Sequence, residues 1–497
     1  MKALFAKVVC LLTALLLMAG VLSACGEKKS PEGGGTTPPS QNTTGSGEGG
    51  DDEDLYDSKG YLKDSLPETY DFDSDFNIYT WDEQQSWEWV DADSEVEGTV
   101  MQKLVERQRN VEDRFGVTIK LVKVHGNWEN RTNFIQTLAN NVQSNMHTYD
   151  LVGQYTPAAG IGAMQGLYYD LNEVPYFDLE KPWWPELISQ TATIGDKLYF
   201  TTGDITPTLI RNVHSMFVNT DLYASLGLAD LADGRSIYDV VRDMDWTLEM
   251  LQTMGIGTVG NQEGMYGITF DNNVQADAFF YGGGFMLVEN VDGVLLLSGD
   301  LSSTTLNDYF DDIKDLFVGE YEDVAITTSS VFSDNQSIFY TGTIAQSQNF
   351  TDEGVHFTIL PMPMRSSEQE NYYTCSSFWV TMYSVPSDAD DLEMSGMILE
   401  ALGSQAYRTL SDEIYYNFFQ TRYNAEDGAD SAQMFDIVSG SVVFDTARLF
   451  ADELSMFSSF RNGVSDTSDP NGSWSSIYGS LHTTWEEKIA NIYGKVG

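Results

Sequence analysis

Flat aromatic and short polar side chains follow several strand-like segments of this sequence. Trp81 and Asp82 end one such segment, Tyr155 and Thr156 end another, and Trp128 lies in a loop after a third. An aromatic face packs on the apolar face of a sugar ring, and carboxylates and hydroxyls hydrogen-bond its hydroxyl groups. These residue types therefore suit the binding of sugar rings, although half-buried packing is the commoner role of any single tryptophan.

Regular elements must bring these side chains together. Segments 76–81, 117–124 and 149–155 are rich in β-branched and aromatic residues, as buried strands are. Helices are expected between them at about 99–115 and 133–146, where apolar residues recur at helical spacing. The order β-α-β-α-β with short connections predicts a parallel sheet. Ligands bind beyond the carboxyl ends of such strands, so these side chains should share one edge.

A second α/β region is expected from about residue 212. Its predicted strands cover 213–219, 265–270, 337–343, 356–360 and 378–385. A helix is expected over 246–254 with Asp245 as its N-cap, and an amphipathic helix over 392–410. The chain after about Asp412 is predicted to be mostly helical, with a break at the polar segment 462–473.

The motifs that would indicate catalysis are absent or stand in the wrong setting. Residues 255–260 match G-x-G-x-x-G, but a dinucleotide site needs a strand before and a helix after it, and here a helix precedes. No Walker loop, H-E-x-x-H or G-x-S-x-G occurs. Residues 91–95 begin like a calcium loop, but Val96 and Gln102 occupy its glycine and terminal glutamate positions. We predict no metal site, no cofactor and no enzymatic activity.

The charge of the chain narrows the possible partners. Its 497 residues include 26 Lys+Arg and 75 Asp+Glu, which gives a formal net charge of -49. Nucleic-acid binding depends on basic groups that neutralise phosphates, so this composition argues against it. The many acidic residues also leave an enzymatic alternative to solute binding open. Two carboxylates that flank a sugar suffice for glycoside cleavage, so a surface glycosidase or lyase remains a second hypothesis.

The N-terminus has the layout of a secretory signal. Lys2 and Lys7 precede the apolar segment 8–22, and small residues then lead to Cys25. The apolar segment is shorter than the ~20 residues that span a bilayer, which favours a cleaved signal over a membrane anchor. Residues 26–54 are rich in Gly, Ser, Thr, Pro and acids and cannot bury enough apolar surface to fold. We expect them to form a disordered tether.

The residues around Cys25 resemble the signal of a bacterial lipoprotein. The resemblance implies a signal peptide over 1–24 that is removed, and acylation of the Cys25 thiol, for example by palmitate, and of the new amino group. A lipid-anchored acidic linker would then cover 25–70. The protein would lie at the bacterial cell surface, attached to the outer leaflet of the cell membrane.

Further segments between Asp75 and the C-terminus carry a second resemblance. They are Lys103–Val117, Asp150–Val152, Gly166–Leu171, Ser215–Asn219, Leu226–Leu228, Trp246–Leu248 and Leu360–Pro363. In order and spacing they resemble the carbohydrate-type, family 1-like solute-binding lipoproteins of bacterial ABC importers. Such proteins are extracellular and serve sugar transport.

The resemblance implies a fold and a mode of action. The fold is α/β and two-lobed, of the periplasmic-binding-protein type II, with two parallel-core lobes, a hinge and a cleft. The first lobe would comprise 71–211 and 372–410, and the second 212–371 and 411–497. The chain would act as a monomer that captures a small solute, a mono- or oligosaccharide, and delivers it to ABC permease subunits.

The resemblance also places ligand-binding positions on this chain. They are Trp81, Asp82, Tyr155, Thr156, Asn212, His214, Asp271, Asn272, Gly342 and Trp379. The family often has an aromatic residue just beyond the last strand-end loop, where this chain has Thr343 and Ile344. That difference weakens the inference of an oligosaccharide. A third hypothesis is a peptide- or amino-acid-type binding protein, which would favour a cationic group near the cleft for the ligand carboxylate, with Arg211 as the hinge candidate.

Overall fold

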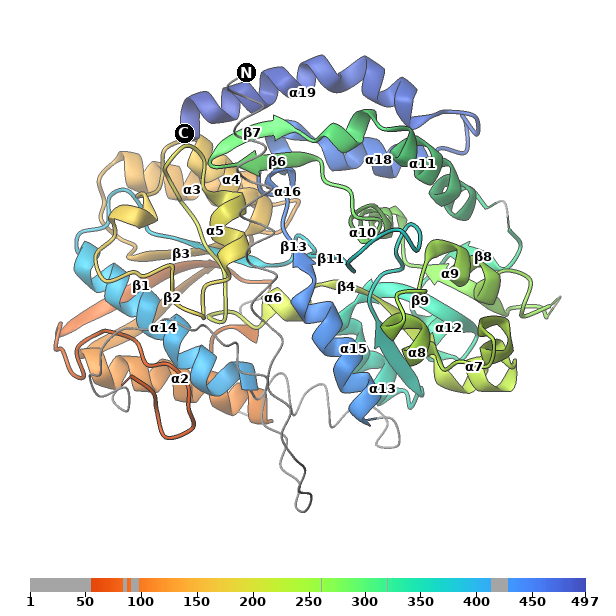
Figure 1. Cartoon of the computed structure of the whole chain (residues 1–497). Coiled ribbons are helices and arrows are strands. Elements are labelled where there is room, and N and C mark those ends of the chain that lie inside the picture. Colours follow the sequence, from red (N-terminus) through yellow and green to blue (C-terminus); the bar gives the residue numbers. More distant parts are fainter. Residues whose placement is uncertain (1–54, 84–86, 91–97, 261, 320, 413–427) are drawn as a thin grey trace, which may run out of the picture. The chain divides into compact units, whose positions relative to one another are not determined.

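The computed structural model describes residues 55–83, 87–90, 98–260, 262–319, 321–412 and 428–497 (Figure 1). The predicted signal peptide, Cys25 and the linker up to residue 54 lie outside these residues. Helices within the described ranges never combine the length and the apolar character that crossing a bilayer requires. Residues 55–497 form one compact unit.

The first sheet has the strand order β12-β3-β1-β2. Its strands are β1 (Ser74–Trp81), β2 (Val117–Val124), β3 (Leu151–Tyr155) and β12 (Thr381–Ser384). β1 runs parallel to both β2 and β3, while β12 is antiparallel to β3. Helices α2 (Thr99–Phe115) and α3 (Arg131–Gln143) form the crossovers, which confirms the predicted β-α-β-α-β order.

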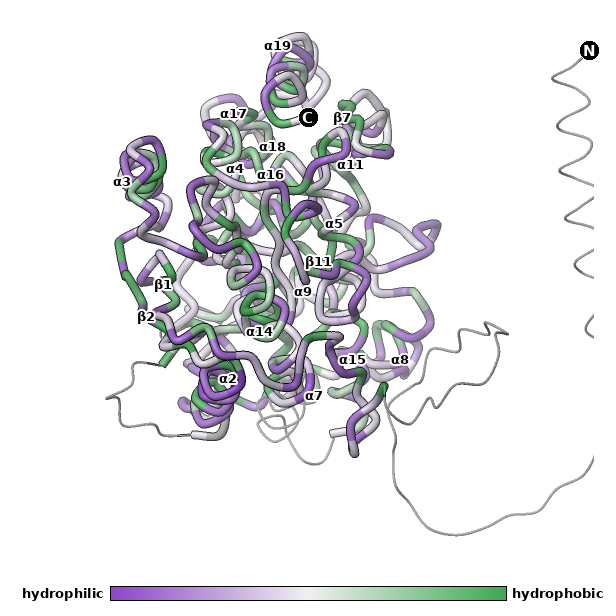
Figure 2. Tube along the Cα trace, turned by 90° about the vertical axis from the view of Figure 1, so that its left-hand side faces the viewer, coloured by the Kyte–Doolittle hydropathy of each residue, from purple (hydrophilic) through white to green (hydrophobic). Residues whose placement is uncertain are grey.

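Helix α2 shows how the pattern of the sequence produces this layer. Hydrophilic residues predominate along it in Figure 2, whereas Leu104, Val111 and Phe115 are buried. Gly116 ends the helix in the left-handed conformation, at φ 61°, and its N–H bonds the carbonyl of Glu112. The chain then enters β2 directly.

The second sheet has the order β10-β4-β9-β5-β8. Its strands are β4 (His214–Asn219), β5 (Tyr266–Phe270), β8 (Val324–Ile326), β9 (Ser337–Thr343) and β10 (Phe357–Leu360). β5 is parallel to β8 and β9, whereas β4 is antiparallel to β9 and β10. The carboxyl ends of β5 and β9 and the start of β4 therefore share one edge.

The helix expected over 246–254 begins later than predicted, as α9 (Leu248–Gly255). Its N-cap is Thr247, whose hydroxyl accepts a hydrogen bond from the Met250 N–H at 3.2 Å. Asp245 instead accepts a hydrogen bond from Arg235 at 2.6 Å. The Trp246 indole is buried and donates to the Pro361 carbonyl, which holds this residue outside the helix.

Two crossing segments connect the sheets. The first crossing segment, 201–213, includes α6 (Thr208–Arg211) and bridges to Tyr383 and Ser376 at its ends. The second crossing segment, 374–380, begins with β11 (Thr374–Cys375), which pairs with β13 (Val442–Val443). Figure 1 shows α6, β11 and β13 between the two sheets. Because the chain must cross here, the strand predicted at 378–385 is shortened to β12.

The C-terminal region is helical, as predicted. The described helices after the gap at 413–427 include α15 (Gly428–Gly440), α16 (Thr446–Leu449), α17 (Ala451–Leu454), α18 (Met456–Val464) and α19 (Trp474–Val496). The break between α18 and α19 falls within the polar segment expected to interrupt the helices. The buried Trp474 anchors α19, because its indole donates to the Leu301 carbonyl at 2.8 Å.

Residues 55–70, which the sequence analysis included in the linker, pack against helices α2 and α14 (Leu392–Asp412). The Asp64 carboxylate is only 2% exposed and pairs with Arg114 at 2.7 Å and Arg408 at 3.1 Å. Burial opposes its charge, but hydrogen bonds from Arg114 and Ser404 and both guanidinium charges outweigh it, so the pKa of Asp64 lies below its usual value. Composition alone does not reveal this pairing.

We expect Asp64→Ala to lower the free energy of unfolding by about 2–3 kcal/mol, because two guanidinium groups lose their partly buried partner. Urea denaturation followed by circular dichroism measures the change. Asp75→Ala, which removes an exposed carboxylate 3.9 Å from Lys120, is the control and should change the free energy by less than about 1 kcal/mol. Equal effects of the two substitutions would contradict the pairing.

Candidate functional site

Three of the predicted residues meet at the edge of the first sheet. Trp81 ends β1, Tyr155 ends β3, and Trp379 precedes β12. The ring centroids of Trp81 lie 5.2 Å from those of Tyr155 and 5.7 Å from those of Trp379. Trp81 is fully buried and donates from Nε1 to the Thr381 hydroxyl, whereas Trp379 is 39% exposed. Of these three rings, Trp379 is therefore the one open to solvent, and Trp81 packs against it from the interior.

The row of rings continues beyond these three residues. Phe378 lies 6.4 Å from Tyr155 and 6.3 Å from Trp128, between ring centroids. Trp128 is partly exposed, and the Arg131 guanidinium stacks 3.7 Å from its ring centroid. Phe457 on α18 packs on Phe378 at 5.0 Å. Together these residues form an aromatic row that runs from the first sheet to the C-terminal helices.

Polar groups stand beside the aromatic row, at the ends of β1 and β2. Asp82 Oδ1 lies 2.9 Å from His125 Nδ1, and Glu83 Oε1 lies 4.0 Å from the same nitrogen. Glu83 also accepts hydrogen bonds from the N–H groups of Gly126 and Asn127. Asp82, Glu83 and His125 are the one group of described residues close enough to hold a metal ion. Their carboxylates are equally suited to accept hydrogen bonds from sugar hydroxyls.

The predicted residues of the second region form a separate group at the edge of the second sheet. Asp271 follows β5 and accepts hydrogen bonds from Tyr340 at 2.6 Å and Gln346 at 2.9 Å, both at Oδ2. A Cβ at Gly342 would lie 2.1 Å from Gln346 Oε1 and 2.5 Å from Tyr340 Cε1, so a larger residue there would displace the two side chains that hold Asp271. Asn272 caps the short helix η5 (Asn273–Gln275) through its side chain. Asp271 is thus held in place, while Asn272 has a structural role.

Two other predicted residues form hydrogen bonds with the second crossing segment, and a third is buried. Asn212 donates to the Trp379 carbonyl at 2.6 Å, and Thr156 donates to the Val380 carbonyl at 2.9 Å. Both bonds fix the backbone around Trp379. His214 is 3% exposed, and neither ring nitrogen has a hydrogen-bond partner among the described residues. Burial lowers the pKa of His214 to about 3, so its imidazole is neutral near pH 7.

A buried charge cluster that no sequence pattern indicates packs against Phe378 of the aromatic row. Asp277 on α10 (Ala276–Gly282) accepts hydrogen bonds from Arg448 at 2.5 Å and Arg461 at 2.6 Å. The Arg448 guanidinium lies 4.0 Å from the Phe378 ring centroid. Along the chain, Asp277 is more than 170 positions from both Arg448 and Arg461. No local spacing in the sequence indicates such a contact.

Glu88 is a second buried acidic residue with several hydrogen-bond partners that no sequence pattern indicates. Its carboxylate accepts hydrogen bonds from Thr206 and Thr208 of the first crossing segment and, at 3.3 Å, from Tyr383 of β12. Burial raises the pKa of Glu88 above its usual value. This carboxyl group therefore joins the first crossing segment to β12, the strand of the first sheet that follows the second crossing segment.

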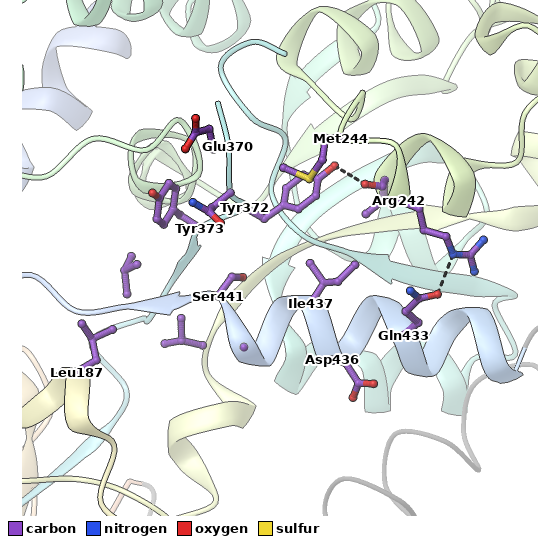
Figure 3. A pocket seen from close by; sticks show the side chains of 15 residues that line it. Leu187, Arg242, Met244, Glu370, Tyr372, Tyr373, Gln433, Asp436, Ile437 and Ser441 are labelled. Carbon is purple, nitrogen blue, oxygen red and sulfur yellow. Dashed lines mark hydrogen bonds between the residues drawn. The ribbon is translucent and has the colours of Figure 1, made fainter. Parts of the chain in front are cut away.

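A cavity of about 790 Å³ lies apart from all predicted site residues (Figure 3). Apolar side chains line much of it, including Met244, Tyr372 and Ile437, and β13 contributes Val442 and Val443. The Tyr372 hydroxyl donates to the Val241 carbonyl at 2.9 Å, and a dashed line from Tyr372 marks this bond in Figure 3. Neither Trp379 nor Asp271 contacts this cavity, so it is not the site that the sequence predicts.

Comparison with known proteins defines the fold. No protein-family model matches the chain, and no curated protein matches it in sequence. The solved structure of the GacH receptor of Streptomyces glaucescens, determined unliganded and with acarbose, matches with a TM-score of 0.54 at 13% identity. That match covers 84% of this chain and 99% of the receptor.

Two other sugar-binding proteins match similarly. The galacto-N-biose/lacto-N-biose I-binding protein of the Bifidobacterium longum ABC transporter has a TM-score of 0.54 at 12% identity, over 84% of this chain and 97% of its own. A cyclo/maltodextrin-binding protein in complex with maltotetraose has a TM-score of 0.55 at 12% identity, over 83% and 97%. The chain therefore has the predicted mixed α/β, two-lobed fold of periplasmic sugar-binding proteins.

Proposed function

We propose that this chain is the solute-binding component of an ABC importer and that its solute is a mono- or oligosaccharide held between the two lobes. The observation that carries the proposal is the aromatic row at the edge of the first sheet, where Trp379 is exposed and packs on Trp81, the residue before Asp82. The structural neighbours named above were solved with acarbose, lacto-N-biose and maltotetraose, which supports a sugar as the ligand.

The proposed mechanism is closure around the ligand. The sugar would pack on Trp379, while Asp82 on one lobe and Asp271 on the other accept its hydroxyl hydrogens. A ligand that contacts both lobes stabilises the closed state by the difference in its affinity for the two states. The crossing segments, joined by the hydrogen bond from Asn212 to the Trp379 carbonyl, would serve as the hinge. No bond of the solute is broken, so the proposal assigns no catalytic residue.

Delivery and location follow from the same proposal. The closed form would dock onto permease subunits in the membrane and release the solute to them. Lipid at Cys25 would keep the monomeric body at the outer face of the cell membrane, with the residues after it as a tether. Mass spectrometry of the membrane fraction tests the anchor, since an acylated N-terminal Cys25 is expected there. An N-terminus at Met1 would contradict the lipoprotein assignment.

Trp379→Ala tests the binding site. We expect it to weaken saccharide binding by about 1–3 kcal/mol, the scale of one buried aromatic contact. The assay is titration calorimetry with the best ligand from a thermal-shift screen of mono- and oligosaccharides. Tyr493→Ala, which removes a 43% exposed aromatic ring on α19, is the matched control and should leave the affinity unchanged. Unchanged affinity in a folded Trp379→Ala variant would remove Trp379 from the site.

A further inference from the structure

Arg211, at the end of α6, is a partly buried cation that has no anionic partner among the residues that the structure describes. Its guanidinium stacks on the Trp87 indole, 3.8 Å from the ring centroid. The Nε atom is completely buried and has no hydrogen-bond acceptor among the described residues. The two terminal nitrogens are not sealed off in the same way, and the described part of the chain offers them no carboxylate either.

Other arginines of the described residues contrast with Arg211. Arg114 and Arg408 share Asp64, Arg448 and Arg461 share Asp277, and Arg131, Arg235 and Arg242 each pair with an aspartate. Arg107 and Arg365 also lack an ion pair with a described carboxylate, but their guanidinium nitrogens donate to backbone carbonyls, Arg107 to Ile205 and Glu88 and Arg365 to Gly283. Arg211 has neither kind of partner among the described residues, and this difference needs a reason.

The missing partner has an energetic cost. A charged group that is partly removed from water is unfavourable unless an opposite charge or a hydrogen bond compensates it. Burial lowers the pKa of Arg211 to about 10, and no neighbouring charge offsets this. Proteins tolerate such local costs chiefly at functional sites, where a ligand supplies the missing interaction.

The place of Arg211 in the fold points to the ligand. It lies on the first crossing segment, directly before Asn212, which bonds the Trp379 carbonyl. Helix α6 contacts η7 (Ile344–Gln346), and Gln346 of η7 holds Asp271. Trp87, its stacking partner, follows the loop after β1. Arg211 thus lies between the two groups of candidate ligand-binding residues.

We infer that Arg211 is the anion subsite of this binding site and that the solute is a saccharide bearing a carboxylate, such as a hexuronic acid. The inference rests on the proposed function and specifies its ligand. Stacking on Trp87 covers a face of the guanidinium and leaves the edge of its terminal nitrogens for a ligand. Such an edge binds a planar carboxylate through two parallel hydrogen bonds.

Pairs of sugars that differ in a carboxylate test the inference when they are titrated into the intact protein. The probes are glucuronate with glucose, galacturonate with galactose, and a uronate-containing disaccharide with its neutral counterpart, each titrated calorimetrically. We expect the acidic member of at least one pair to bind 10-fold or more tightly than the neutral one. Arg211→Gln should weaken binding of the acidic sugar by about 10- to 100-fold, the scale of charged hydrogen bonds, and leave the neutral sugar unaffected.

Arg235→Gln is the control, because it removes an arginine that pairs with Asp243 and Asp245 away from the crossing segments. If Arg211→Gln does not fold, the wild-type preference within the pairs decides alone. Preferential binding of neutral sugars would overturn the Arg211 inference and leave the proposed function intact. Binding of amino acids or peptides, lost in Arg211→Gln and with no sugar bound, would overturn the proposed function and the saccharide while keeping Arg211 as the anion subsite.

Discussion

Replacing Trp81 by alanine is expected to lower the free energy of unfolding by about 3–5 kcal/mol, the usual cost of removing a fully buried aromatic side chain. Trp81 is completely enclosed, packs on Tyr155 and Trp379, and loses its bond to Thr381 on substitution. Urea denaturation measured by circular dichroism gives the change directly.

Trp379→Ala serves as the comparison for Trp81→Ala. Because Trp379 is partly exposed, its substitution should cost clearly less stability and act mainly on ligand affinity. The two tryptophans are neighbours in the same aromatic row, so the comparison distinguishes a side chain that stabilises the fold from one that contacts the ligand. A Trp81→Ala variant with wild-type stability would contradict the packing described here.

The second large effect is expected at Asp277. Asp277→Ala should destabilise the fold by about 3–5 kcal/mol, because it leaves Arg448 buried without a counter-charge and deprives Arg461 of its partner. Burial opposes the charge on Asp277, but Arg461 and Arg448 outweigh it and hold its pKa below the usual range. Its stabilising contribution is therefore present above the pKa of an unfolded aspartate and is lost as the pH falls through the lower pKa of the folded protein.

The surface pair of Asp243 with Arg235 provides the control for Asp277. Asp243 is largely exposed, so Asp243→Ala should change the free energy of unfolding by about 1 kcal/mol or less. Denaturation at pH 7 and at a series of lower pH values measures both variants. A wild-type stability that exceeds that of Asp277→Ala by the same margin at a pH well below both pKa values would contradict the role of the charge.

Much of the fold was predictable because local patterns report burial. The β-branched strands β2 and β9 and the amphipathic helices α2 and α14 alternate or repeat at the spacing of their element. The alternation of strands and helices then predicts parallel strands, and a ligand is expected at the edge where their carboxyl ends meet. The start of α9 was misplaced, since both Asp245 and Thr247 suit an N-cap and only the burial of Trp246 decides between them.

The site was predictable only in part. Trp81, Tyr155 and Trp379 are predicted to bind the ligand, and the structure brings their rings together, but the sequence could not tell which of them is exposed. Their contact with a ligand stays a prediction. Asp277 and Glu88 were missed because their partners come from distant parts of the chain. A single acid among 75 carries no mark of such pairing until the helices are packed.

The most direct test of the proposed function is titration calorimetry of the intact body with the saccharide that raises its melting temperature most, combined with analysis of the sugar after prolonged incubation. A solute-binding protein should give a saturable 1:1 isotherm and return the sugar chemically unchanged. Release of cleaved sugar at turnover rates, or the failure of every mono- and oligosaccharide to bind, would contradict the account.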